Sequence, residues 1–270
     1  MYTMYYSFSN IPFHKELPHD KLFESASLKE GLARMEHLKK TRGIGLIAGE
    51  AGSGKTSAIR AFTGNLNNSL YKVVYFPLST VSPNDFYRGL LYGLGEIPKS
   101  KKIDMFGQIQ AAILTLYKNQ KITPVIVLDE MHLASNAFLD DISLLFNFYM
   151  DSENPFILCI IGLPHLLDRL RLMQFQPLEQ RIVIRHRHRA LLPEEAAPYI
   201  EHHLKMAGSS APIFKPSAVE AIAAKSSCLP RVINNITTHA LIYGAANKSP
   251  SCSNDLMKRC SSLLAARALD

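Results

Sequence analysis

Residues 49–56 read Gly49-Glu50-Ala51-Gly52-Ser53-Gly54-Lys55-Thr56, and this octapeptide is the strongest structural signal in the chain. It follows the apolar run Ile44–Ala48 and opens the segment SAIRAFTGN, which has a helical pattern. The glycines let backbone N–H groups surround a phosphate without interference from a Cβ, and the start of a helix adds partial positive charge. A strand before and a helix after are the context that this pattern requires. The octapeptide therefore predicts a nucleotide phosphate site.

The residues of this loop have expected roles toward ATP and Mg²⁺, the two expected cofactors. Lys55 is expected to reach the β- and γ-phosphates, and the Thr56 hydroxyl is expected to ligate Mg²⁺. The expected nucleotide-binding residues of the loop are Gly49, Glu50, Ala51, Gly52, Ser53, Gly54, Lys55, Thr56 and Ser57.

A second signal is the apolar run Val125–Leu128, which ends in Asp129-Glu130. Asp129 fits the Mg²⁺ position, and Glu130 is placed to polarise a water for attack on the γ-phosphate. The alternative is that the acidic pair caps the helix that follows, a role that Asp129 can combine with metal binding. The two signals together predict an ATPase that converts ATP and water to ADP and phosphate.

Composition supports an ordinary globular chain. Of its 270 residues 47% are hydrophobic and 20% are charged, which excludes a mostly disordered or fibrous protein. The longest stretch without Asp, Glu, Lys or Arg is the 16 residues Val232–Asn247, too short for a membrane-spanning helix. The N-terminus lacks a basic region followed by an apolar one, so we expect a cytoplasmic protein with no membrane partner.

Short apolar runs alternate with helical periods up to residue 190, which predicts an α/β fold with a parallel five-stranded sheet flanked by helices. The expected strands are Ile44–Ala48, Val73–Phe76, Val125–Leu128, Phe156–Ile161 and Ile182–His186. The expected helices between them are Lys55–Asn65, Pro83–Leu94, Ile103–Asn119, Ala137–Met150 and His165–Met173. After Leu191 the pattern is helical, with starts expected at Pro193, Pro216, Pro230 and Ser253.

With these motifs the chain resembles the AAA+ ATPases, and within them the ExeA-like group. The resemblance is carried by Phe8 and Pro12-Phe13 ahead of Leu22-Phe23, by GEAGSGKT, VIVLDEMHL, IIGLPHLLDRL and LEQRI, and by Leu229-Pro230-Arg231-Val232-Ile233-Asn234. It implies a P-loop NTPase (AAA+) sheet domain followed by a small all-helical lid domain. The expected division is 1–40, an N-terminal segment packing on the nucleotide site; 41–190, the ATPase domain; and 191–270, the lid.

The resemblance also implies an oligomer, a ring or filament with ATP held between subunits. Arg181 in LEQRI matches the family's arginine finger, which approaches the γ-phosphate of the next subunit. On spacing alone, a surface arginine at a strand edge is an equal alternative. Arg231 matches the arginine that reports the nucleotide to the lid, and its place at a helix start calls for an anionic partner.

Two positions depart from the family pattern. Relatives commonly carry Gln where this chain has Leu163, and an apolar side chain cannot orient the attacking water, so slow hydrolysis is expected. Met131-His132 replaces Ala-His, and His132 is interpreted as a packed or capping histidine, with nucleotide sensing as the alternative.

The compact form is similar to the TniB and TnsC type regulators that accompany DDE transposases. It implies an ATP-dependent regulator that oligomerises on DNA and recruits or activates a transposase, with hydrolysis driving release. Two other functions stay open: a nucleotide-gated switch with little turnover, which Leu163 favours, and a secretion-type ATPase that acts on protein partners at a membrane.

The net charge of +7 is compatible with a polyanionic partner. Arg181, Arg185, Arg187 and Arg189 are expected on one face of an extended segment, with Ile182, Ile184, His186 and His188 on the other. Lys99, Lys101 and Lys102 form a second basic patch. Both patches are DNA-binding candidates whose contacts would be largely sequence-independent and salt-dependent. The alternative is a set of solvated surface charges.

Overall fold

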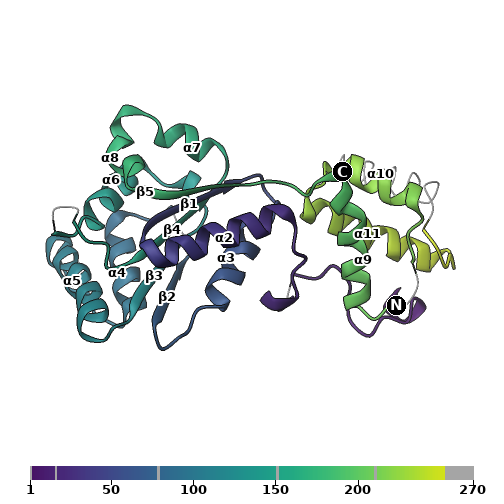
Figure 1. Ribbon diagram of the computed structural model, residues 1–270, viewed down its shortest axis with the longest axis horizontal. Helices are drawn as coiled ribbons and strands as arrows, with labels where there is room; N and C mark the ends of the chain where they lie inside the picture. Colours follow the sequence, from purple (N-terminus) through teal and green to yellow (C-terminus); the bar gives the residue numbers. More distant parts are fainter. Residues whose placement is uncertain (1, 16, 78–79, 150–151, 210–211, 253–270) are drawn as a thin grey trace. The chain divides into compact units, whose positions relative to one another are not determined.

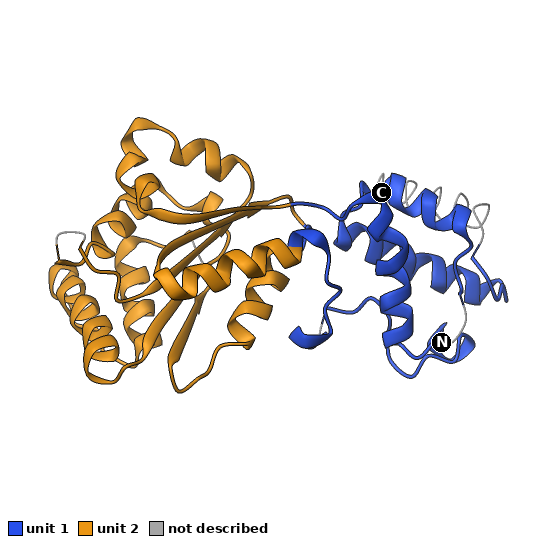
Figure 2. Cartoon of the chain, viewed as in Figure 1, with its two compact units in different colours: residues 1–27, 52–54, 189–270 blue, residues 28–51, 55–188 orange. Residues whose placement is uncertain are grey.

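The computed structural model describes residues 2–15, 17–77, 80–149, 152–209 and 212–252 (Figure 1). The chain forms two compact units, which Figure 2 shows in different colours. Unit 1 contains residues 1–27, 52–54 and 189–270, and unit 2 contains residues 28–51 and 55–188. Among the described residues, no helix combines the length and the apolar character needed to cross a bilayer.

Unit 2 is built on a five-stranded parallel sheet, as expected. Its strands are β1 (Gly43–Gly49), β2 (Tyr71–Phe76), β3 (Thr123–Leu128), β4 (Ile157–Gly162) and β5 (Ile182–His188). Their order is β2-β3-β4-β1-β5, with all neighbouring pairs parallel. All residues of β1 and β4 are buried because both faces of these inner strands are covered, whereas β2 and β5 are edge strands with exposed residues.

Helices cover both faces of the sheet (Figure 1). On one face, α2 (Ala26–Thr41) and α3 (Lys55–Gly64) pack through side chains such as Met35 and Phe62 against Val127 of β3. The other face is covered by α4 (Pro83–Leu94), α5 (Lys102–Leu114), α6 (Asn136–Leu145), α7 (His165–Leu170) and α8 (Gln176–Gln180). The alternation of side chains along each strand divides the apolar residues between these two cores.

Two expected helices are shorter in the structure. The helix expected over 137–150 ends at Leu145, where Phe146 leaves helical geometry. The helix expected over 165–173 ends at Leu170, because Leu172 is extended, with φ −63° and ψ 143°, and a 3-10 turn follows at Met173–Phe175. The expected helix 103–119 is confirmed as α5 followed by a π-helical turn at Thr115–Asn119.

Unit 1 is helical. It contains α1 (Tyr2–Tyr5), 3-10 turns at His19–Lys21 and Pro193–Glu195, α9 (Ala196–Met206), α10 (Pro216–Ser226) and α11 (Pro230–Ala246). The expected starts at Pro216 and Pro230 are confirmed, and Pro193 opens the 3-10 turn that leads into α9; the start expected at Ser253 lies outside the described residues.

The N-terminal segment groups with these helices, and this differs from the expected division at residues 40 and 190. Phe8 and Phe13 are buried in one core with Ile200 and Leu241, and burying aromatic rings stabilises such a core strongly. The Ser9 N–H also donates to the Ala207 carbonyl at 2.8 Å. Packing among side chains distant in sequence therefore decides where this segment lies.

Candidate nucleotide and magnesium site

The phosphate loop joins the last residue of β1, Gly49, to the first residue of α3, Lys55. Gly52 and Gly54 have φ values of +79° and +111°, in a region of backbone space that glycine adopts without strain. Ser53 between them is buried, and its Oγ has no hydrogen-bond partner among the described residues. A turn of this kind with an unsatisfied hydroxyl fits a bound phosphate, which would supply the missing acceptor.

Lys55 is held over its own loop. Its side chain is buried, with the residue 8% exposed, and Nζ donates to the carbonyl oxygens of Gly49 at 2.7 Å and Glu50 at 2.9 Å. A buried ammonium group requires such acceptors because its desolvation is costly. The fold thus keeps a cation at the start of α3, where the loop and the helix N-terminus meet.

Asp129 follows β3 directly and is 4% exposed. Its Oδ2 accepts hydrogen bonds from Thr56 Oγ1 at 3.4 Å and from the Tyr75 hydroxyl at 3.0 Å. Its Oδ1 accepts from the Glu130 N–H at 2.8 Å. The hydroxyl of Thr56 and the carboxylate of Asp129 are hard oxygen ligands, so the pair fits Mg²⁺.

Glu130 is also positioned at this edge, with its side chain 56% exposed. Its φ of 54° and ψ of 32° place a non-glycine residue in the left-handed region, a strained conformation that is common at functional sites. Its Oε2 lies 3.4 Å from His132 Nδ1. Burial lowers the pKa of His132, and the nearby Glu130 acts in the opposite direction.

The strand register brings the two motifs to one edge of the sheet. Ala48 of β1 is paired with Gly162 of β4, and Leu128 of β3 is paired with Ile160 of the same strand. Leu163 follows β4 and is half-buried. The carboxyl ends of β1, β3 and β4 therefore lie together, as is usual for ligand sites of parallel sheets.

The two expected arginines of the site lie in different units. Arg181 caps the C-terminus of α8 and donates from its guanidinium to the Ser143 carbonyl. Arg231 lies in the first turn of α11, in unit 1, and is exposed. Its backbone N–H donates to the Gly52 carbonyl at 3.2 Å, a contact within unit 1, to which the loop tip 52–54 is assigned.

The expected row of four arginines is corrected by the structure. Within β5, Arg185 and Arg187 are exposed, and His186 and His188 are buried on the other face, so the alternation is confirmed inside the strand. Arg181 lies before the strand on a helix end, and Arg189 lies after it. The row is thus limited to two residues, because a helix end does not follow the period of a strand.

The basic candidates differ in their partners. Arg185 pairs with Glu179 at 2.6 Å, and Lys102 pairs with Asp141 at 2.7 Å. The other candidates are exposed and make no ion pair within the described ranges: Lys99, Lys101, Arg187 and Arg189.

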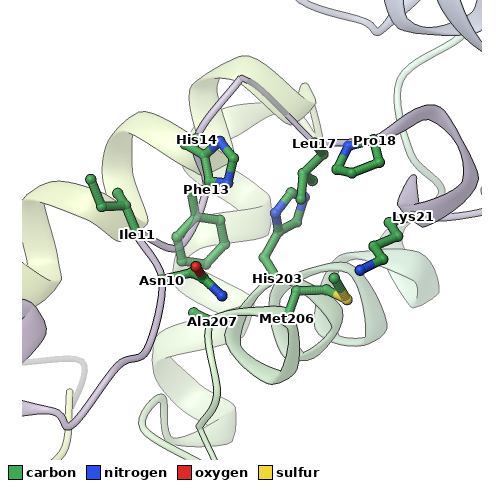
Figure 3. Close-up of a pocket in the computed structure, with 10 residues that line it drawn as sticks. All are labelled: Asn10, Ile11, Phe13, His14, Leu17, Pro18, Lys21, His203, Met206 and Ala207. Carbon is green, nitrogen blue, oxygen red and sulfur yellow. The ribbon is translucent and has the colours of Figure 1, made fainter.

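A separate cavity of about 210 Å³ lies in unit 1 (Figure 3). Phe13 and His203 form part of its wall, with ring centroids 5.1 Å apart. Burial, followed by the nearby His202 and His14, lowers the pKa of His203 to about 3. None of the expected site residues lines this cavity, so it is distinct from the phosphate loop.

Tyr75 is the contributor to the site that sequence reasoning missed. The period of two along β2 places it on the same face as Tyr71, but which strand lies next to β2 is decided by the tertiary fold. A tyrosine near the end of an expected strand was the available signal, and by itself it is weak.

Known proteins support this description. Residues 37–170 match the family model of the AAA domain. The General secretion pathway protein A of Aeromonas hydrophila is 28% identical over 253 residues, which cover 92% of this chain and 46% of that protein. The chain thus spans less than half the length of this relative.

Solved structures show the same fold at low identity. Cdc6p of Pyrobaculum aerophilum has a TM-score of 0.65 at 14% identity, covering 96% of this chain and 70% of that one. The ADP form of the Aeropyrum pernix ORC2 protein has a TM-score of 0.65 at 16% identity, covering 96% and 72%. The Thermotoga maritima RuvB Holliday junction branch migration motor has a TM-score of 0.56 at 18% identity, covering 88% and 68%.

These structures establish the P-loop NTPase fold. Residues 37–170 are thus similar to an AAA domain, and the chain is similar over 92% of its length to the General secretion pathway protein A.

Proposed function

We propose that this chain binds and hydrolyses Mg²⁺-ATP at the carboxyl ends of β1 and β3, and that it uses the nucleotide cycle to assemble on DNA. The observation that carries the proposal is the buried Asp129 carboxylate, which faces Thr56 beside the buried ammonium of Lys55. Buried Lys and Asp side chains are rare, and finding both at a phosphate loop, next to the exposed hydroxyl of Thr56, is typical of a ligand site.

The residues have distinct roles in the proposed reaction. Thr56 and Asp129 would hold Mg²⁺, which neutralises phosphate charge when bound. Lys55 stabilises negative charge that develops on the transferred phosphoryl group. Glu130 accepts a proton from the attacking water, a role that suits an exposed carboxylate at the edge of the sheet. The loop residues 49–57 contribute backbone N–H groups to the phosphates.

Two further features regulate turnover in this proposal. Leu163 offers no hydrogen bond to the attacking water, so the isolated subunit turns over slowly. Arg181 supplies positive charge to the site of a neighbouring subunit in an assembled ring or filament, and Arg231 couples the nucleotide to the helical unit. Hydrolysis would then depend on assembly, and the loss of ATP would release the assembly.

We propose that the subunits assemble on DNA. Lys99 and Lys101 lie on the segment between α4 and α5, and both side chains are exposed. The Gln108 amide holds this segment, since it donates to the Ile97 carbonyl at 2.8 Å and accepts from the Lys99 N–H at 3.2 Å. Cations on a held segment suit contacts to phosphates in a sequence-independent manner.

The proposed partner of the assembly is a DDE transposase, and the proposed location is the cytoplasm. The support for both is the similarity of the motifs to the TniB and TnsC type regulators. The test is electron microscopy of the protein with a non-hydrolysable ATP analogue, with and without random-sequence duplex DNA. We expect rings or filaments that require both nucleotide and DNA, and particles indifferent to DNA would contradict the DNA part of the proposal.

A second candidate is an ATPase that acts on protein partners in a secretion pathway. It is favoured by the 28% identity to the General secretion pathway protein A over 92% of this chain. Co-sedimentation with membranes, together with an ATPase rate unaffected by DNA, would support this function over the first. A phosphate release that stops after one turnover would instead support a nucleotide-gated switch.

A further inference from the structure

Tyr75 lies on the edge strand β2, one strand away from Asp129. In the parallel register Tyr75 is paired with Val127 of β3, and Asp129 is two residues beyond Val127. Because side chains alternate along a strand, Tyr75, Val127 and Asp129 share one face of the sheet. It is the face covered by α3, the helix that carries Thr56.

The Tyr75 hydroxyl donates to Asp129 Oδ2 at 3.0 Å, and Thr56 Oγ1 donates to the same oxygen at the longer distance of 3.4 Å. The Glu130 N–H binds the other oxygen. Each carboxylate oxygen is thereby held by at least one donor, and the rotation of the carboxylate about χ2 is restricted. Tyr75 supplies the shorter of the two hydroxyl contacts to the oxygen that faces Thr56.

The donor in this contact is the phenol. Burial, followed by the charge and the hydrogen bond of Asp129, raises the pKa of Tyr75 to about 12. Tyr75 is nevertheless 49% exposed, so its ring contributes less to the core than that of a buried tyrosine. An exposed ring that sends its hydroxyl to a buried carboxylate is better explained by orientation of that carboxylate than by packing.

We propose that Tyr75 is a positioning residue that orients the Asp129 carboxylate for Mg²⁺ in the nucleotide site. The inference rests on the proposed function. Residues that hold a metal ligand by hydrogen bonding typically change metal affinity by about 10- to 100-fold when removed. Tyr75 would act in this way without touching the nucleotide.

The test compares Tyr75→Phe with Tyr71→Phe. Both changes remove one hydroxyl from β2, but the Tyr71 hydroxyl makes no hydrogen bond to the part of the chain that is described, so Tyr71→Phe is the matched control. The measurement is the Kd of Mn²⁺ in the presence of ADP, followed by electron paramagnetic resonance. We expect Tyr75→Phe to weaken Mn²⁺ binding about tenfold and Tyr71→Phe to leave it unchanged.

A kinetic readout separates positioning from a structural role. For Tyr75→Phe the Mg²⁺ concentration needed for half-maximal hydrolysis should rise about tenfold, and kcat at saturating Mg²⁺ should be largely kept. ADP binding in EDTA should equal that of the wild type. A Mn²⁺ Kd that is unchanged or tighter in Tyr75→Phe overturns the inference while the proposed function stands. A wild-type protein that binds no Mn²⁺ with ADP overturns both.

Discussion

Two regions of the molecule place charged residues in very different surroundings. One is the nucleotide edge, formed by the carboxyl ends of β1, β3 and β4, and the other is the basic surface, formed by Lys99, Lys101 and Lys102. At the nucleotide edge, Lys55 and Asp129 are buried, and neighbouring groups hold both of them. On the basic surface, Lys99 and Lys101 extend into solvent, whereas Lys102 is already neutralised by Asp141. The nucleotide-site residues that motifs predicted are thus held in place by the fold. Of the DNA-binding candidates that charge alone predicted, only some are free of an internal ion pair within the described part of the chain.

The difference has a physical origin. A phosphate loop works only if the backbone, the cation and the carboxylate are all placed by the fold, so its residues depend on one another. A surface lysine contributes to nucleic-acid binding in proportion to the counterions it displaces, and an internal carboxylate removes that contribution. The same net charge can therefore describe a binding surface or a set of internal ion pairs.

The largest effect is expected at Lys55. Lys55→Ala removes the cation from the phosphate loop, and we expect ATP binding to weaken by about a thousandfold or more. Calorimetric titration with ATP measures the change. Lys72→Ala is the matched control, because Lys72 Nζ also donates to a backbone carbonyl, that of Leu94 at 2.6 Å, away from the loop. Equal ATP affinity in the two variants would show that Lys55 contributes no more to ATP binding than a lysine away from the loop.

Arg181→Ala should lower the ATPase rate of the assembled protein by about a thousandfold, the low end for an arginine finger. The isolated subunit should be less affected, because the finger acts on a neighbour. The rate is measured as phosphate release against protein concentration.

Mixing variants tests whether Arg181 acts in trans. An Arg181→Ala subunit keeps an intact site, and a Glu130→Gln subunit keeps the arginine, so a mixture should regain activity that neither has alone. If the mixture stays inactive, Arg181 has a role within its own subunit, consistent with its contact to Ser143.

Glu130→Gln should reduce hydrolysis by about a hundredfold or more, because the amide cannot accept the proton of the attacking water. ATP binding should persist, and the assembled state should accumulate on DNA. Single-turnover hydrolysis and particle size are the two measurements. A fully active Glu130→Gln variant would show that the carboxylate is not the general base.

The smallest effect is expected on the basic surface. Replacing both Lys99 and Lys101 with Ala should weaken duplex DNA binding about tenfold and reduce the salt dependence by up to about two released counterions. Lys102→Ala should leave DNA affinity nearly unchanged because this lysine is paired with Asp141. Fluorescence anisotropy across salt concentrations measures the DNA affinity and its salt dependence for both variants. An equal loss of DNA affinity in the two variants would show that the ion pair with Asp141 does not keep Lys102 from binding DNA.

Much of the molecule could be predicted from local sequence. The octapeptide 49–56 determined the turn and the start of α3, because glycine and helix-start chemistry act over a few residues. Alternation and apolar runs located the five strands, and Pro216 and Pro230 marked helix starts. These features depend on neighbours in the chain, so the sequence alone determines them.

The tertiary structure decided those features that depend on contacts between residues far apart in the sequence. The order β2-β3-β4-β1-β5 brings Tyr75 to Asp129, and aromatic packing draws the N-terminal segment into the helical unit. The tertiary structure also determined which basic residues pair with carboxylates, and it placed Arg181 at a helix end rather than on the extended segment expected to carry the arginine row. Hydrogen bonds and ion pairs between segments far apart in the chain follow from the packed arrangement, and no local pattern records them.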